Sequence, residues 1–61
     1  MTLGYYKRLV RNCLRKAVKT EDKDHEDYVN KMMKEYEDEF PWFLEKNFSP
    51  ELAATAILMG L

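Results

Sequence analysis

Apolar residues recur every three or four positions between residues 5 and 19, with adjacent pairs at Leu9-Val10 and Cys13-Leu14. On a helix of 3.6 residues per turn these apolar residues fall within an arc of about 140°. A β-strand would send the two members of each adjacent pair to opposite faces. The pattern therefore predicts an amphipathic helix over 5–19. Its apolar face holds Tyr6, Leu9, Val10, Cys13, Leu14 and Ala17. Its opposite, basic face holds Lys7, Arg8, Arg11, Arg15 and Lys19.

A second helical pattern covers residues 25–39, after a polar segment in which Asp22 or Asp24 is the expected N-cap. Pro41 disfavours α conformation at the residue before it, so we expect the second helix to end at Phe40. One face of this helix is apolar. It holds Tyr28, Val29, Met32, Met33, Tyr36 and Phe40.

The strongest helix start in the chain is Ser49-Pro50-Glu51, with a capping serine, a proline in the first turn and an acid behind it. It predicts a third helix over 50–59, after a bend at 41–47 that has room for one helical turn. This helix is apolar on every side, which is typical of a buried helix. Two other helices can hardly enclose it in so short a chain, so we expect a second copy to complete the fold as a homodimer; the alternative is that a different protein covers this surface.

Together these patterns predict an all-α fold, a small three-helix domain that spans 1–61 as a single unit, with helices near 5–19, 25–39 and 50–59. A chain of 61 residues forms a small core, so a partner or second copy would add stability. The expected core is Leu9, Val10, Cys13, Leu14, Tyr28, Met32, Tyr36, Phe40, Leu52, Ala56 and Ile57.

The cysteine content and the apolar runs bear on location. Cys13 is the one cysteine, so no disulfide can form within the chain, whereas secreted proteins of this size usually carry several. The first nine residues contain no apolar run of signal-peptide length, and the longest apolar run, 52–61, is interrupted by Thr55 and too short to span a bilayer. These observations predict an intracellular, cytoplasmic protein without a transmembrane segment.

Charge is divided along the chain although the net charge is only −1. Residues 1–20 carry six basic side chains and no acid, whereas residues 21–45 carry ten acids and three lysines. The basic face of the first helix therefore has three interpretations: it binds an external polyanion, it pairs with the acidic second helix, or it is solvated. The sequence does not choose among them.

The spacing Asp22-x-Asp24-x-Glu26 resembles the opening of a calcium-binding EF-hand loop. The resemblance fails at Asp27, where the loop requires glycine, and at Met33, where it requires glutamate. A solvated, capping acidic loop is the better interpretation. We therefore predict no metal site here.

Candidate catalytic groups are few. Cys13 lies on an apolar face, where thiols are usually inert, and His25 has no further nitrogen or sulfur ligands with which to hold a metal. Ser49 is better interpreted as a helix cap than as a nucleophile. No glycine-rich phosphate loop occurs. We therefore predict a non-enzymatic protein without a cofactor.

The leading functional hypothesis is a small helical protein–protein interaction module, a class that includes regulators and inhibitors of larger proteins from phages and mobile elements. The candidate protein-binding residues are Trp42, Phe43, Leu58, Met59 and Leu61, because exposed aromatic and aliphatic side chains anchor interfaces. One alternative is nucleic-acid binding through the basic face of the first helix; the adjoining acidic segment opposes it. Another is a structural, self-assembling subunit.

Overall fold

The computed structural model describes residues 1–18 and 24–60, without the side chains of Asp24 and His25. It contains α1 (Leu3–Ala17), α2 (Asp24–Glu35), a 3-10 turn η1 (Glu37–Glu39), α3 (Phe40–Glu45) and α4 (Pro50–Leu58). No strand occurs within these ranges, so the predicted all-α class is confirmed. The expectations for Lys19, Asp22, Leu61 and the Asp24 and His25 side chains lie outside the described residues.

Helix α1 begins two residues before the predicted start. Thr2 caps it, because its Oγ1 accepts a hydrogen bond from the backbone N–H of Tyr5 at 3.2 Å. The helix ends at Ala17, since Val18 has the extended dihedrals φ −87° and ψ 95°. Arg8 and Arg11 therefore lie inside the helix, and Arg15 lies in its last turn.

The second predicted helix is shorter than expected. Helix α2 ends at Glu35, and residues 37–39 form η1 instead of continuing the helix to 39. The prediction that Pro41 ends a helix at Phe40 is wrong, because Phe40 is helical (φ −60°, ψ −40°) and is the first residue of α3. Proline lacks an N–H, but the first turn of a helix leaves its N–H groups unpaired, so Pro41 fits the start of α3.

A tight turn joins α3 to α4. Asn47 has a left-handed φ of 60°, a conformation that asparagine tolerates better than most residues. The N–H of Phe48 donates to the carbonyl of Phe43 at 2.9 Å and that of Asn47 to Leu44 at 3.1 Å, the pattern of a Schellman cap. This turn presents the Phe48 carbonyl to the Tyr6 hydroxyl, which donates to it at 2.9 Å.

Helix α4 begins where the sequence predicts. The Ser49 side chain accepts from the N–H of Leu52 at 3.1 Å, and Pro50 occupies the first turn. The helix ends at Leu58, one residue before the predicted end, and Gly60 follows with φ 75°. None of the helices in the described part of the chain is long and apolar enough to cross a membrane.

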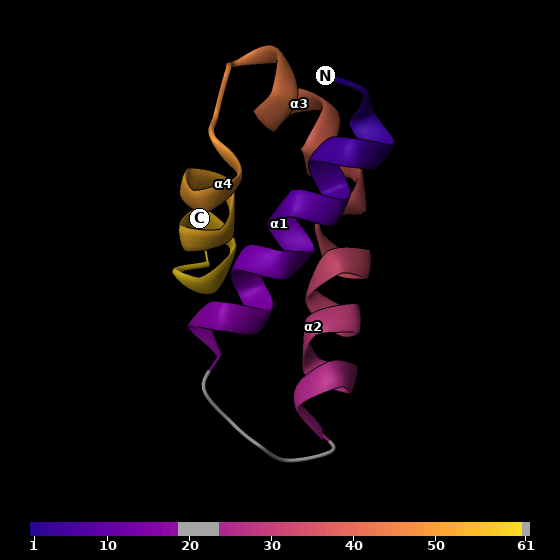
Figure 1. The fold of residues 1–61 in the computed structure, drawn as a ribbon, viewed down its shortest axis with the longest axis vertical. Coiled ribbons are helices and arrows are strands. Elements are labelled where there is room, and N and C mark those ends of the chain that lie inside the picture. Colours follow the sequence, from indigo (N-terminus) through magenta and orange to yellow (C-terminus); the bar gives the residue numbers. More distant parts are fainter. Residues whose placement is uncertain (19–23, 61) are drawn as a thin grey trace.

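Helix α1 is the central element. Figure 1 shows α4 on one side of α1, α2 on the other, and α3 across the end that holds the N terminus. Helix α1 contacts all three of these helices. The hydrophobic core forms around it. This core consists of Tyr6, Val10, Leu14, Val29, Met33, Phe40, Phe43, Ala53, Ala54, Ala56 and Ile57.

The predicted core is partly correct in α1 and α4, and less so in α2. Five predicted residues are buried: Val10, Leu14, Phe40, Ala56 and Ile57. Leu9, Cys13, Met32 and Tyr36 are partly buried. The predicted burial of Tyr28 and Leu52 is wrong, because 43% and 50% of their surfaces are exposed. In both helices the next residue is buried instead: Val29, which has no polar group to solvate, and Ala53, whose small side chain allows close packing.

Candidate interaction surfaces

Polar contacts join the basic face of α1 to α2. Lys7 Nζ lies 3.9 Å from Glu37 Oε1, and Arg15 forms an ion pair with Glu26. Between them, Arg11 Nη1 donates to Asn30 Oδ1 at 2.9 Å. Lys7 lies early in α1, and its partner Glu37 follows the end of α2. Arg15 lies late in α1, and its partner Glu26 lies near the start of α2. The two helices are therefore antiparallel. The described part of the basic face thus lies beside the acidic segment.

A surface hollow of about 760 Å³ lies along the seam between α1 and α2, and we call it the basic groove. Its floor includes Met33 and Phe40, whose side chains belong to the core. Lys7 Nζ lies 5.9 Å from the centre of the Phe40 ring, within the range of a cation–π contact. The charged residues that line the groove are Lys7, Arg8, Arg11, Arg15, Lys34 and Glu37.

Helix α4 has one buried and one exposed face. Ala53, Ala54, Ala56 and Ile57 are buried, whereas the exposed residues lie within an arc of about 120°. We call this arc the outer face of α4. It consists of Glu51, Leu52, Thr55, Leu58 and Met59. Leu52 is 50% exposed, Leu58 38% and Met59 67%.

The outer face of α4 is nearly uncharged. The Thr55 hydroxyl donates to the Glu51 carbonyl at 3.0 Å, so its hydrogen-bonding capacity is partly satisfied inside the helix. Glu51 carries the one charge, and it lies in the first turn, where an acid interacts favourably with the helix dipole. The rest of the face is therefore an apolar strip along the outside of the helix.

The aromatic candidates separate into one exposed and one buried residue. Trp42 is 47% exposed, whereas Phe43 is 5% exposed and belongs to the core. The two rings meet edge to face at 5.7 Å between centroids, and Trp42 makes a similar contact with Phe48 at 5.4 Å. Trp42 lies on α3, whereas Leu58 and Met59 lie at the end of α4. Figure 1 shows α3 away from the last turn of α4, so Trp42 does not belong to the same patch as Leu58 and Met59.

Cys13 is partly buried beside α4. Burial, and to a smaller extent the Glu51 carboxylate, raise the pKa of the Cys13 thiol, while Lys16 acts in the opposite direction. A raised pKa reduces the thiolate fraction at neutral pH, which is the opposite of what a nucleophilic cysteine requires. The expected role of Cys13 as a packing residue fits this environment.

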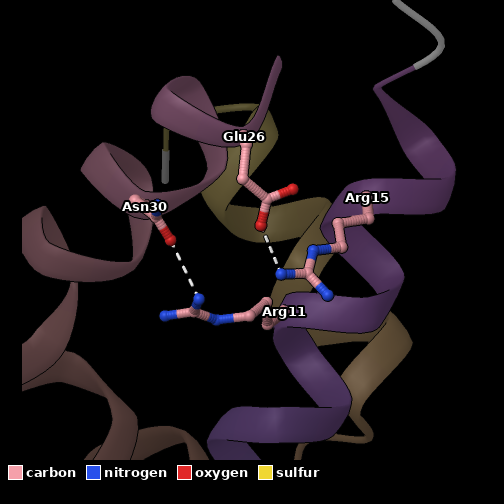
Figure 2. Close-up of polar contacts among 4 residues, drawn as sticks. All are labelled: Arg11, Arg15, Glu26 and Asn30. Carbon is pink, nitrogen blue, oxygen red and sulfur yellow. Dashed lines mark hydrogen bonds and ion pairs between the residues drawn. The ribbon is translucent and has the colours of Figure 1, made fainter. Parts of the chain in front are cut away.

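Sequence reasoning identified the basic residues of α1 but not their partners on α2. Figure 2 shows Arg11 directed toward Asn30 and Arg15 directed toward Glu26, contacts that the sequence did not specify. The signal that predicts such contacts is their spacing: Glu26 and Asn30 are four residues apart, as are Arg11 and Arg15, so each pair lies on one helical face.

Comparison with known proteins adds no further constraint on the function of these surfaces. No protein-family model matches the chain, and no curated protein or solved structure matches it.

Proposed function

We propose that the chain is a small, non-catalytic helical protein-interaction module that docks through the outer face of α4. The observation that supports this is the exposure of Leu52, Leu58 and Met59 on one nearly uncharged strip. Full burial of an aliphatic side chain of this size stabilises by about 1.5–3 kcal/mol relative to full exposure. A partner that covers the strip would recover part of that free energy.

A second copy of the chain is the occupant that suits this face best. In a twofold contact each surface meets its own copy, so a like charge near the axis would face its equivalent. The outer face avoids this, because its one charged residue, Glu51, stands at the beginning of the helix. We therefore propose a homodimer. A larger protein that presented a similar apolar surface would compete for the same strip, and the chain would then regulate or inhibit that protein.

Sedimentation equilibrium at micromolar concentrations tests the homodimer. We expect the 7.3 kDa chain to associate with increasing concentration, and Met59→Glu to return it to the monomer. Lys31→Gln is the matched control, because it makes the same change in net charge at an exposed position of α2. A single monomeric species at every concentration would reject the homodimer, and a dimer that survives Met59→Glu would place the contact elsewhere.

Photo-cross-linking tests the module more broadly. A photoreactive residue at position 59 should give a defined adduct in the native host, with a second copy or with a larger protein. The same residue at position 31 should give none. If position 59 forms no adduct under conditions where the protein is folded, the outer face of α4 is not a docking surface.

A further inference from the structure

The basic groove lies on the opposite side of α1 from α4, and its charge is unbalanced. Five of the side chains that line it are basic and one, Glu37, is acidic. Lys7 and Arg15 have carboxylate partners. Arg8, Arg11 and Lys34 have none among the described residues. These three cations remain available to an anionic ligand.

The arginines of the groove are partly oriented before any ligand binds. A guanidinium has five N–H donors in a fixed plane. Arg11 uses Nη1 for Asn30, and Arg15 uses Nη2 for Glu26. Figure 2 shows both side chains extended from α1 toward α2 across the seam. Donors held in this way lose less conformational freedom on binding, and their geometry matches a carboxylate or a phosphate.

The length of the cationic stretch limits the ligand. Lys7 and Arg15 are eight positions apart on α1, which is about 12 Å at a rise of roughly 1.5 Å per residue. A segment of two helical turns, or of about four extended residues, covers the same distance. The groove therefore fits a short anionic segment better than a long one.

The surroundings of the groove favour a peptide over a nucleic acid. Glu37 lines the groove and is followed by exposed Asp38 and Glu39, with Glu35 exposed at the end of α2. A nucleic-acid strand carries a charge every 3.4 Å or so along its length and would continue past the cations onto these acids. A peptide can place its carboxylates opposite the arginines and then end or change composition.

We propose that the basic groove is a second docking site, and that its occupant is a short acidic segment of a partner protein whose carboxylates contact Arg8, Arg11 and Lys34. The charge and the length of the groove support this site, which is independent of the outer face of α4. The chain would then bind a partner through a charged contact on one side of α1 and an apolar contact on the other.

Fluorescence anisotropy with a labelled peptide of about eight glutamates, at two salt concentrations, tests the groove. We expect binding that weakens with salt and that falls at least about tenfold in Arg8→Gln with Arg11→Gln, since two charged contacts to the peptide are lost. The control pair, Lys16→Gln with Lys46→Gln, removes the same charge from exposed positions outside the groove and should change affinity less than twofold. Circular dichroism confirms that each variant is folded.

Four outcomes would overturn the proposal. Absence of peptide binding is the first. Equal weakening of binding by both variant pairs is the second, because net charge alone would then attract the peptide. A single-stranded or duplex oligonucleotide of equal charge that binds more tightly would assign the groove to nucleic acid. Loss of self-association in Arg8→Gln with Arg11→Gln would make a second copy the occupant. Met59→Glu should leave peptide binding unchanged, so failure at the groove and failure at α4 are separate results.

Discussion

The two sides of α1 hold their neighbours by different means. Toward α4 the contact is apolar, and α4 contributes Ala53, Ala54, Ala56 and Ile57 to the core. No hydrogen bond or ion pair between side chains joins these two helices within the described ranges. The small side chains allow close approach, so this side depends on packing density. Adding or removing even one methylene group there should lower the stability of the fold.

Toward α2 the contact combines an apolar centre with a polar margin. Val29 and Met33 are buried, while Arg11 and Arg15 reach Asn30 and Glu26 at the surface. Exposed ion pairs contribute little to stability, so the polar margin sets the alignment of the helices more than their free energy of association. The comparison predicts that substitutions on the α4 side affect folding, whereas substitutions on the polar α2 side affect binding.

The largest effect should come from Ile57→Ala. Ile57 is 1% exposed, and its truncation leaves a cavity that the surrounding side chains fill only partly. The free energy of unfolding should fall by about 2–5 kcal/mol, a large part of the stability of so small a protein. Urea denaturation followed by Trp42 fluorescence measures it. Leu52→Ala, at a half-exposed position of the same helix, is the control and should cost less when both variants are measured at a concentration where the chain is monomeric; equal costs would contradict the packing of α4.

The next effect is the reverse change, Ala53→Leu. Ala53 is fully buried, so three additional carbon atoms have no space between α4 and the core, and we expect a loss of about 1–3 kcal/mol. Thr55→Leu introduces the same side chain on the outer face of α4 and should be nearly neutral. Thermal unfolding of the two variants compares them. If Ala53→Leu is neutral, close packing does not define this side of α1.

The sequence predicts the helices better than it predicts their faces. Ser49 and Pro50 mark the start of α4 by local hydrogen bonding alone, and that boundary is confirmed. The position at which α2 ends is not determined by local sequence. Phe40 is fully buried, and the chain turns at η1 to bring this residue to the core. The choice between Tyr28 and Val29 likewise depends on how α2 rotates against α1, which periodicity leaves undetermined.

The same distinction applies to the candidate sites. The basic residues of α1 are recognisable from the sequence, because their shared face depends only on helical spacing. The sequence predicts that Phe43 binds a partner, but Phe43 is buried against Trp42. The orientation of α3 determines which of these two adjacent aromatic residues is exposed to water. The groove depends on both α1 and α2, so Lys34 could be added to it only from the structure.

Tyr6→Phe is expected to have a moderate effect. It removes the hydrogen bond to the Phe48 carbonyl and should cost about 0.5–1.5 kcal/mol at neutral pH. Burial raises the pKa of the Tyr6 hydroxyl, so the folded state keeps this proton at a pH where the unfolded state loses it. Above pH 10 or so the wild-type chain should therefore lose stability relative to the variant. Urea denaturation at pH 7 and pH 11 checks this; a difference that does not change with pH would contradict it.

The smallest effect should come from Glu26→Gln, which removes the ion pair with Arg15. Both side chains are about half exposed, so the interaction is solvated and should contribute about 0–1 kcal/mol. Glu26 also lies in the first turn of α2, where loss of an acid costs a further 0.3–1 kcal/mol or so through the helix dipole. A double-mutant cycle with Arg15→Gln, measured by urea denaturation at low salt and at about 1 M salt, separates the two contributions. The coupling free energy should be small and should shrink with salt, because Val29 and Met33 hold α2 in place. A coupling above about 2 kcal/mol that survives high salt would show that charge, and not apolar packing, fixes α2 against α1, and the two sides of α1 would then differ less than their contacts indicate.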